Sequence, residues 1–381
     1  MMQAKTIKLF VDAHSFDKKY QGTQTFIREL YGGLMSTHPE LDIYWGAADA
    51  GRLRAALPLV KPENILPYKN NKGGVSRFLF DIPYYLKKYR FDFAHFQYLA
   101  PRQQGNCRYI VTLHDVLFNN FPADFSYTYR ASRNFLFGKS IKNAAIKTTV
   151  SPYSRQCIAD DYKIAADTIH VIPNGVSHTF TQFHQNKEEA AKIVKEKFGI
   201  ENFILYVSRV EPRKNHALLL EKYIELELYK QHIALVFIGI ESMGVARLQK
   251  AIQGLNDEER ALFFWLNDIS QADLSAFYTA CRLFVYPSKA EGFGIPPLEA
   301  AICGAPVLCS SATAMSSFTF FEPYTFDPEN EEEFKHKLLN LVNNPPSAGF
   351  LNRVAEQVSE KYQWKQSGEI FYNLLLADKA L

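Results

Sequence analysis

The chain has 381 residues, of which 47% are hydrophobic and 22% are charged, and its formal net charge is +3. This length is too great for one ordinary hydrophobic core and suits two domains of roughly 150–200 residues each. So small a net charge does not by itself indicate nucleic-acid binding. The N-terminus lacks the pattern of a signal peptide, and no run approaches the roughly 18–20 apolar residues of a membrane-spanning helix. We therefore expect a cytoplasmic protein that is at most peripheral to a membrane.

Short apolar runs alternate with longer amphipathic stretches through the first half of the chain. The runs predict strands, and the stretch 22–35 predicts a helix whose Phe26, Leu30 and Leu34 line one side. The strands predicted in this half are residues 7–13, 42–48, 91–97, 109–115 and 146–151. Alternation of this kind favours a parallel, doubly wound α/β sheet.

The pattern restarts after the turn signal Pro173-Asn174-Gly175, and we place the joint between two domains at residues 174–187. The elements predicted beyond it are strands at 203–208, 234–239, 262–266, 283–287 and 306–310, and helices near 216–229, 244–254, 271–280 and 296–303. We predict domains at 1–175 and 185–362, with a C-terminal helix at 363–381 that packs back on the first. Two Rossmann-like domains of this kind would face a central cleft at the carboxyl ends of their strands.

The five cysteines show neither CxxC spacing nor clustering with histidine, and several lie in apolar runs. This usage is typical of reduced, buried cysteines in a cytosolic protein. It predicts no zinc site.

Two cations follow the strand predicted at 203–208, in the stretch "YVSRVEPRKNHALLLEKY". Arg209 and Lys214 lie in the loop that leads to the next helix, where an open α/β sheet binds its ligands. A guanidinium and an ammonium beside the N–H groups of a helix start form a receptor for phosphate. The alternative is a pair of exposed basic residues without a role.

A second candidate segment is "KAEGFGIPPLEAAICGAP" at 289–306, which predicts a loop and then a helix begun by one of its prolines. Glu291 lies on the loop, and Glu299 is expected in the first turn of the helix. Carboxylates so placed can accept hydrogen bonds from vicinal hydroxyls, while Gly292 and Gly294 allow close approach of the backbone to a ligand. In the alternative interpretation Glu291 caps the helix and Glu299 only interacts with its dipole.

Taken in order, these segments resemble a known enzyme family. "SRVEPRKN" followed by "EGFGIPPLEA" is similar to the donor-binding signature of the GT4 family of retaining glycosyltransferases, which have the GT-B fold. The spacing of the glutamates at 291 and 299 matches that family's motif. "VTLHDV" at 111–116 and the stretches 150–176 and 263–288 also resemble family segments. The similarity is greatest to the mannosyltransferase-like branch.

The resemblance implies a role for each matching residue. Arg209 and Lys214 would neutralise the departing diphosphate. Glu299 would accept hydrogen bonds from the ribose, and Glu291 from the transferred sugar, as a clamp and not as a covalent nucleophile. His114 would lie beside the reacting sugar. Further residues implied to bind the donor are Gly22, Thr23, Leu266, Asn267, Gly292, Phe293, Gly294 and Ile295.

Three positions depart from the family's usual pattern. Ser208 stands where a glycine usually precedes the arginine. "GTQTF" at 22–26 lacks the usual second glycine, so Thr23 or Gln24 could contact phosphate by its side chain. "SSATAMSSFTFF" at 310–321 lacks the usual acidic residue, so no role for that region is carried over.

The resemblance implies a metal-independent hexosyltransferase that uses a nucleotide-diphosphate sugar and needs no cofactor. We expect GDP-mannose as its donor and a saccharide or lipid-linked acceptor in cell-surface polysaccharide synthesis. The alternatives are a UDP-sugar donor, a sugar-nucleotide epimerase of the same fold, and a binding module without turnover. Nucleic acid is not an expected partner.

Two stretches leave membrane contact open. From Phe125 to Ala159 there is no acidic residue among several lysines and arginines, which predicts either a face for anionic lipid or phosphate, or a solvated basic helix. "RFLFDIPYYLKKYRF" at 77–91 predicts either an amphipathic helix facing a membrane or a core helix with solvated lysines.

Overall fold

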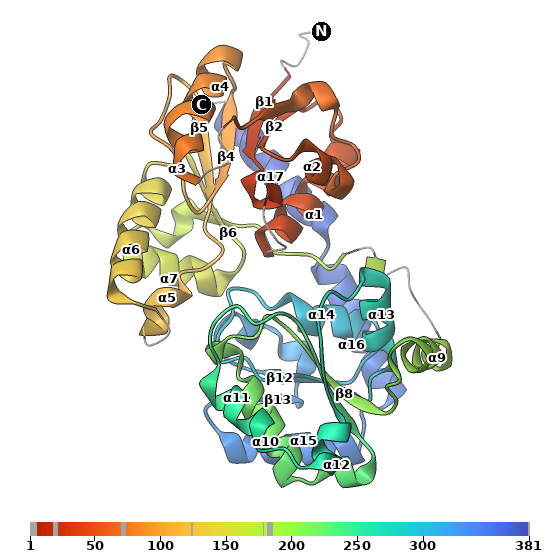
Figure 1. The fold of residues 1–381 in the computed structure, drawn as a ribbon. Coiled ribbons are helices and arrows are strands. Elements are labelled where there is room, and N and C mark those ends of the chain that lie inside the picture. The colour runs from red at the N-terminus through yellow and green to blue at the C-terminus, as the bar shows by residue number, and fades with distance from the viewer. Residues whose placement is uncertain are drawn as a thin grey trace. The chain divides into compact units, whose positions relative to one another are not determined.

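A computed structural model describes residues 6–17, 22–69, 74–122, 125–177, 179–180 and 186–379. The chain divides into two compact domains, the first made of Met1–Gly175 with Gln363–Leu381 and the second of Val176–Tyr362 (Figure 1). The second domain thus begins ahead of the start predicted at residue 185. Residues 178 and 181–185 of the predicted joint lie outside the described residues.

Within the described residues, the first domain holds a seven-stranded parallel sheet in the order β3-β2-β1-β4-β5-β6-β7. The chain runs from β1 out to β3, returns to β4 beside β1, and continues to β7. The sheet is therefore doubly wound, with its switch point between β1 and β4. The strands are β1 Lys8–Asp12, β2 Asp42–Ala47, β3 Ile65–Pro67, β4 Phe93–Gln97, β5 Arg108–Thr112, β6 Ile146–Thr149 and β7 Ile169–Val171.

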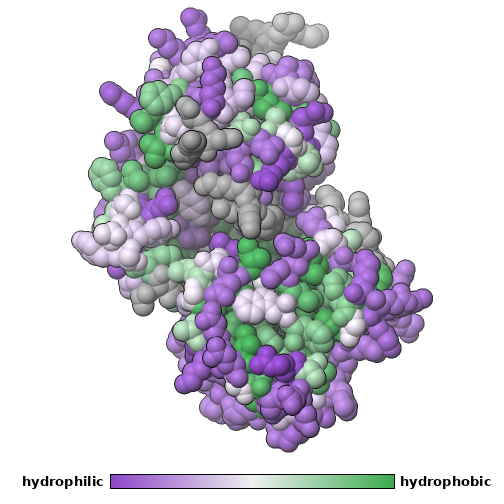
Figure 2. All heavy atoms as spheres, in the orientation of Figure 1, coloured by the Kyte–Doolittle hydropathy of each residue, from purple (hydrophilic) through white to green (hydrophobic). Residues whose placement is uncertain are grey.

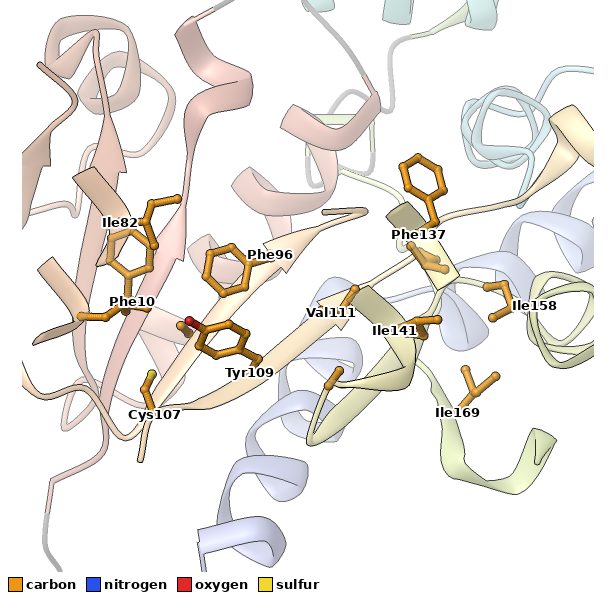
Figure 3. Close-up of a cluster of buried hydrophobic side chains, with 14 of the residues drawn as sticks. Phe10, Ile82, Phe96, Cys107, Tyr109, Val111, Phe137, Ile141, Ile158 and Ile169 are labelled. Carbon is orange, nitrogen blue, oxygen red and sulfur yellow. The ribbon is translucent and has the colours of Figure 1, made fainter. Parts of the chain in front are cut away.

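Helices cover both faces of this sheet. On one face α1 and α17 pack together, and the Tyr31 ring lies 5.8 Å from Phe371 of α17 and 5.8 Å from His95 of β4. On the other face α4, α6 and α7 bury side chains such as Phe137 in a cluster with Phe96, the next residue of β4 (Figure 3). The helices of this domain are α1 Gly22–Thr37, α2 Ala50–Ala56, α3 Gly74–Ser76, α4 Ile82–Tyr89, α5 Leu117–Asn120, α6 Tyr127–Lys142, α7 Pro152–Tyr162 and α17 Trp364–Lys379.

The second domain repeats this architecture. Its sheet, within the described residues, has six parallel strands in the order β10-β9-β8-β11-β12-β13, with the switch point between β8 and β11. The strands are β8 Phe203–Val207, β9 Ala234–Ile238, β10 Phe263–Leu266, β11 Leu283–Tyr286, β12 Val307–Ser310 and β13 Thr325–Phe326. The helices are α9 Lys187–Phe198, α10 His216–Glu225, α11 Ala246–Gln253, α12 Asp257–Ala261, α13 Gln271–Ala280, α14 Ile295–Ile302, α15 Glu331–Asn343 and α16 Ala348–Lys361.

The prediction of two doubly wound α/β domains is confirmed, whereas the cleft between them stays a prediction. The sequence prediction misses β3, β7 and β13, which have only two or three residues and so show no periodic pattern. The helix predicted at 216–229 ends at Glu225, because Glu227 takes a left-handed conformation with φ of 50°. No helix among the described residues is both long enough and apolar enough to span a bilayer.

Candidate functional site

The loops that follow β8 and β11 lie on either side of the switch point of the second sheet. The two strands are parallel neighbours, so their carboxyl ends share one edge. The first loop enters α10 through the 3-10 turn Pro212–Lys214, and the second leads into α14. The backbone N–H of Lys289 donates to the carbonyl oxygen of Arg213 at 2.8 Å, which joins the two loops directly.

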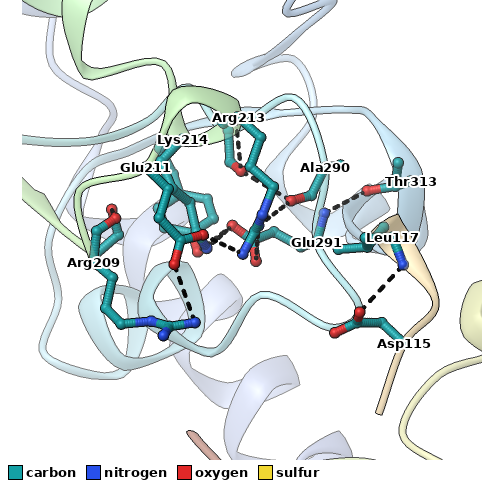
Figure 4. A network of polar contacts seen from close by, with 12 residues as sticks. Asp115, Leu117, Arg209, Glu211, Arg213, Lys214, Ala290, Glu291 and Thr313 are labelled. Carbon is teal, nitrogen blue, oxygen red and sulfur yellow. Dashed lines mark hydrogen bonds and ion pairs between the residues drawn. The ribbon is translucent and has the colours of Figure 1, made fainter. Parts of the chain in front are cut away.

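Lys214 and Glu291, one from each loop, form an ion pair at this edge (Figure 4). Each residue is only 7% exposed. Glu291 Oε1 also accepts a hydrogen bond from the Tyr286 hydroxyl at 2.8 Å, and the Glu291 N–H donates to Thr313 Oγ1 at 2.9 Å. The alternative in which Lys214 is an exposed loop lysine is therefore wrong. So is the alternative in which Glu291 caps α14, whose N-cap is Gly294.

Two residues that the sequence prediction does not single out, Glu211 and Arg213, complete this charged cluster. Arg213 Nη2 lies 2.7 Å from Glu211 Oε2, while its Nη1 donates to the Ala290 carbonyl oxygen at 2.8 Å and lies 3.6 Å from Glu291 Oε2. Arg209, whose side chain is 50% exposed, reaches Glu211 Oε1 at 3.2 Å. The alternating charges of "RVEPRK" are the sequence signal for these pairs. Which cation takes which carboxylate follows from the path of the loop.

The two carboxylates of the charged cluster remain ionised although they are buried. Burial by itself raises the pKa of Glu291, but Lys214 and Arg213 outweigh that effect and lower the pKa to about 2. Burial likewise acts to raise the pKa of Glu211, and Arg213 and Arg209 together lower it. Burial lowers the pKa of Lys214, and the Glu291 carboxylate opposes this shift. A phosphate bound here would meet cations that the fold already holds in place.

The glycine-rich loop before α14 takes a conformation that favours glycine at one position. Gly294 has φ of 95°, and a Cβ there would lie 3.1 Å from Met315 Cγ and 3.3 Å from the Phe318 ring. Phe293 packs its ring against Phe318 and Tyr362. The backbone of residues 292–295 is therefore held in one path beside Glu291.

The sequence pattern predicts Glu299 in the first turn of α14, and this prediction is wrong. The residue lies in the second turn, because the helix begins at Ile295, ahead of both prolines. Its Oε2 accepts a hydrogen bond from the Tyr278 hydroxyl of α13 at 2.9 Å. Glu291 is held by the β8 loop. The two glutamates of the motif therefore have different partners within the domain.

Leu266 and Asn267 lie at the same edge of the sheet, two strands away from the end of β8. Leu266 ends β10, which β9 separates from β8. Its carbonyl oxygen accepts a hydrogen bond from the Gly239 N–H at 2.9 Å, and Asn267 beyond it is exposed. Their contact with a nucleotide base stays a prediction.

In the first domain, His114 stands at one end of a row of hydrogen-bonded, uncharged side chains that spans β4, β5 and β6. This row, called the neutral chain below, consists of His114, Gln97, His95, Thr112 and Thr148. His114 Nε2 lies 2.7 Å from Gln97 Oε1, and Gln97 Nε2 lies 3.1 Å from His95 Nε2. His95 Nε2 also lies 2.7 Å from Thr112 Oγ1, which is 2.6 Å from Thr148 Oγ1. Because the Gln97 amide oxygen accepts, Nε2 of His114 carries the proton and Nδ1 carries the lone pair. The sequence prediction singles out His114 but misses Gln97 and His95, which lie inside a predicted strand.

Both histidines of this neutral chain are uncharged near neutral pH. Burial lowers the pKa of His114 to about 4 and that of His95 to about 3. The Tyr31 hydroxyl lies 2.7 Å from His95 Nδ1, and the Phe26 ring meets His114 edge-on at 4.9 Å. His114 can therefore accept a hydrogen bond, but it contributes no positive charge to a site.

Gly22 and Thr23 open α1 in the first domain. A Cβ at Gly22 would meet no described atom within 4 Å. Gln24 Nε2 donates to the Ser15 carbonyl oxygen at 2.5 Å, so this amide is already engaged within the domain. The contact of Gly22 and Thr23 with phosphate stays a prediction.

Two protein-family models match the chain, one in each half. The model described as "Glycosyltransferase Family 4" matches residues 20–180, and the model described as "Glycosyl transferases group 1" matches residues 187–360, which include the whole charged cluster. The chain belongs to glycosyltransferase family 4. The family 4 chain has two doubly wound domains, and its fold is of the GT-B type.

Several proteins are similar to this family 4 chain. The serotype-specific mannosyltransferase WbdA from Escherichia coli is 26% identical over 224 residues, which are 58% of this chain and 27% of WbdA. The O-antigen chain mannosyltransferase RfbU from Salmonella typhimurium is 26% identical over 243 residues, 64% of this chain and 63% of RfbU. The chain thus spans less than two thirds of the length of either curated relative. The solved structure of HepE from Anabaena in complex with UDP and glucose has a TM-score of 0.72 at 16% identity, covering 97% of this chain and 100% of HepE.

Metal ligands do not gather in the described part of the family 4 chain. No group of three or more His, Cys, Asp or Glu side chains there could hold a metal ion. In the charged cluster the carboxylates of Glu211 and Glu291 are each paired with cations of the chain itself. Independence of the reaction from metal stays a prediction.

Proposed function

We propose that this family 4 chain is a retaining hexosyltransferase that acts at the cytoplasmic side of a membrane. It moves a hexose from a nucleotide-diphosphate sugar to a saccharide or lipid-linked acceptor in cell-surface polysaccharide synthesis, and GDP-mannose is the first candidate donor. The observation that carries the proposal is the charged cluster around Lys214 and Glu291 at the switch point of the second sheet. The names of WbdA and RfbU support mannose as the sugar.

In the proposed reaction, Arg209 and Lys214 act on the leaving group. The bond from C1 of the hexose to the diphosphate oxygen breaks, while the acceptor oxygen bonds to C1 from the same face. The acceptor's proton passes to the departing diphosphate. Negative charge grows on that diphosphate, and cations that are already in place stabilise it without reorganisation. Because the chain supplies these cations itself, we propose that the reaction needs neither a metal ion nor a cofactor.

The other site residues bind and orient the donor in this proposal. Glu291 accepts hydrogen bonds from hexose hydroxyls beside the diphosphate, and Glu299 accepts them from the ribose. The proton on His114 Nε2 is engaged by Gln97, so Nδ1 is the atom that accepts a hydrogen bond from the hexose. Thr23 contacts the phosphate by its side chain, and contacts made largely through the backbone come from Gly22, Leu266, Asn267, Gly292, Phe293, Gly294 and Ile295.

The test is a product assay with GDP-mannose and, separately, UDP-glucose, each offered with mannoside acceptors in the presence of a chelator. A UDP-sugar is the second candidate donor, because the structure of HepE holds UDP and glucose. We expect a new mannoside whose anomeric configuration, read by NMR, is that of the donor. An inverted product would contradict retention, an epimerised donor would show an isomerase, and loss of activity on chelation would show a need for metal. Binding without turnover would make the chain a binding module.

A further inference from the structure

The helical stretch 74–89 exposes a stripe of large apolar side chains that the proposed reaction does not use. The short helix α3, a π-helical turn at Arg77–Asp81 and α4 follow one another without a break. The exposed fractions along it are 68% for Val75, 62% for Leu79, 65% for Phe80 and 55% for Tyr84. Apolar side chains that gather on one exposed face mark a surface that a partner covers.

The opposite face of this stretch is firmly attached to the domain. Ile82, Tyr85 and Leu86 belong to the buried cluster beneath α4. Arg77 Nε donates to Asp12 Oδ2 of β1 at 3.2 Å, and both residues are buried. The stripe is therefore held outward by the fold. Leu79 and Phe80, neighbours in the π-helical turn, both lie on the outer side.

The charges beside the stripe have one sign. Lys87, Lys88 and Arg90 are exposed at its C-terminal end. Asp81 is the one acidic residue in the sequence from 69 to 90, and it is only 7% exposed. The outer surface of this stretch therefore combines apolar side chains with cations and suits an anionic partner.

A second stripe of the same composition lies on α6. Its exposed apolar side chains are Tyr127 at 80%, Tyr129 at 41%, Phe135 at 69% and Leu136 at 41%. Lys139 and Lys142 are exposed on the same helix, and no acidic residue occurs from 125 to 159. Since α4 and α6 bury their inner sides in one cluster on one face of the sheet, their outer sides point away from the sheet together. Figure 2 shows hydrophobic and hydrophilic side chains mixed over this part of the first domain.

We propose that these two stripes, residues 75–88 and 127–142, form a docking surface for a bilayer with anionic headgroups. Amphipathic helices lie in a membrane interface when aromatic and aliphatic side chains enter it and flanking lysines meet the phosphates. A bilayer surface can contact both helices at once, and its anionic headgroups match the exposed lysines that accompany the apolar side chains on each helix. The docking goes beyond the proposed transfer reaction and does not depend on it. It would hold the chain where lipid-linked acceptors lie.

The experiment measures sedimentation of the full chain with vesicles of phosphatidylcholine alone and with about one third phosphatidylglycerol. We expect binding to the anionic vesicles only, weakened by added salt. The double variant Leu79→Ser/Phe80→Ser should lower the partition coefficient about tenfold or more by loss of apolar insertion. Lys87→Glu/Lys88→Glu should lower it about fivefold or more for each cation.

Matched controls separate docking from general effects. Ile370→Ser/Leu376→Ser removes two partly exposed apolar side chains of α17, on the other layer of the same domain. Lys192→Glu/Lys195→Glu makes the same change of net charge on α9 of the second domain. Both controls should bind vesicles as the unchanged chain does, and every variant should keep its melting temperature and its stabilisation by nucleotide sugar.

Three outcomes would overturn the proposal. The unchanged chain could fail to bind anionic vesicles, or the docking variants could bind as tightly as their controls. Alternatively, Leu79→Ser/Phe80→Ser could convert a dimer into a monomer by light scattering with no change in vesicle binding, which would make the stripe a contact between two copies. A chain that docks but transfers no sugar would contradict the proposed function and leave the docking intact.

Discussion

The two domains share a doubly wound sheet topology, but they bury charged side chains at the strand ends of the second domain and uncharged polar side chains in the first. In the second domain, carboxylates and cations are buried together in the charged cluster, and Glu291 remains ionised because Lys214 and Arg213 outweigh its burial. In the first domain, the neutral chain from Thr148 to His114 is uncharged because burial disfavours imidazolium.

In the proposed function, this difference divides the work of binding a nucleotide sugar between the two domains. A diphosphate carries charge and gains from cations that are already in place. A sugar carries hydroxyl groups, which are matched by a neutral acceptor with a fixed tautomer. The proposed function accordingly assigns the charged part of the donor to the second domain and a hydrogen bond to the sugar to His114 of the first.

The largest effect should come from breaking the charged cluster. We expect Lys214→Ala to lower turnover at least about a hundredfold, the scale seen when one preorganised donor to a developing charge is removed. Steady-state kinetics with the identified donor measures it. Lys289→Ala is the matched control, because this lysine lies in the neighbouring loop and its ammonium forms an ion pair with the exposed Glu329 outside the charged cluster. Near-normal turnover of Lys214→Ala would remove this residue from the diphosphate site.

As the pH falls, stability should be lost first through the histidines of the neutral chain and only at lower pH through the carboxylates of the charged cluster. The folded pKa of His95, about 3, lies below its ordinary value of 6.5, so the unfolded chain binds a proton that the folded chain does not. Stability is therefore full above pH 6.5 and falls as the pH drops. We expect His95 alone to lower the free energy of unfolding by about 1.5 kcal/mol between about pH 6.5 and about pH 5. Urea denaturation across this range measures the loss, and a flat profile would contradict a neutral His95.

Removal of the second glutamate of the motif should affect binding more than chemistry. We expect Glu299→Ala to raise the KM for the donor about tenfold with little change in kcat, because ribose contacts are the same in the ground and transition states. Glu332→Ala on α15 is the control for loss of one carboxylate in the same domain. A fall in kcat alone would rule out the ribose role.

A negative charge placed at Gln97, within the neutral chain, should raise the pKa of His114 at its end. In Gln97→Glu a carboxylate would face His114 Nε2 and favour the imidazolium, so the pKa of His114 should rise from about 4 by about one unit or more. NMR titration of labelled histidine reads this directly. Gln103→Glu adds the same charge in an exposed loop and should leave the His114 signal unchanged. Equal titration in both variants would show that Gln97 does not hold His114.

Much of the fold could be predicted from the sequence because long strands have a clear pattern. The strand runs at 91–97 and 203–208 match β4 and β8 closely. The short edge strands β3, β7 and β13 could not be predicted, since two or three residues take their conformation from a neighbouring strand.

The site was predictable in part for a different reason. Lys214 and Glu291 stand at strand ends, which parallel topology brings to one edge. Arg213 and Gln97 were not predictable, because their roles rest on which side chain lies within reach once the loops and strands are packed. The turn of α14 that holds Glu299 depends on a helix start one residue before the prolines.

The most direct test of the charged cluster is calorimetric titration of nucleoside diphosphates into the unchanged chain, Lys214→Ala and Lys289→Ala. If the cluster binds the diphosphate, the unchanged chain and Lys289→Ala will share one Kd for GDP or UDP, and Lys214→Ala will bind at least about tenfold more weakly. Equal affinity of all three for both nucleotides, or no affinity of the unchanged chain for either, would contradict a diphosphate site at the ends of β8 and β11.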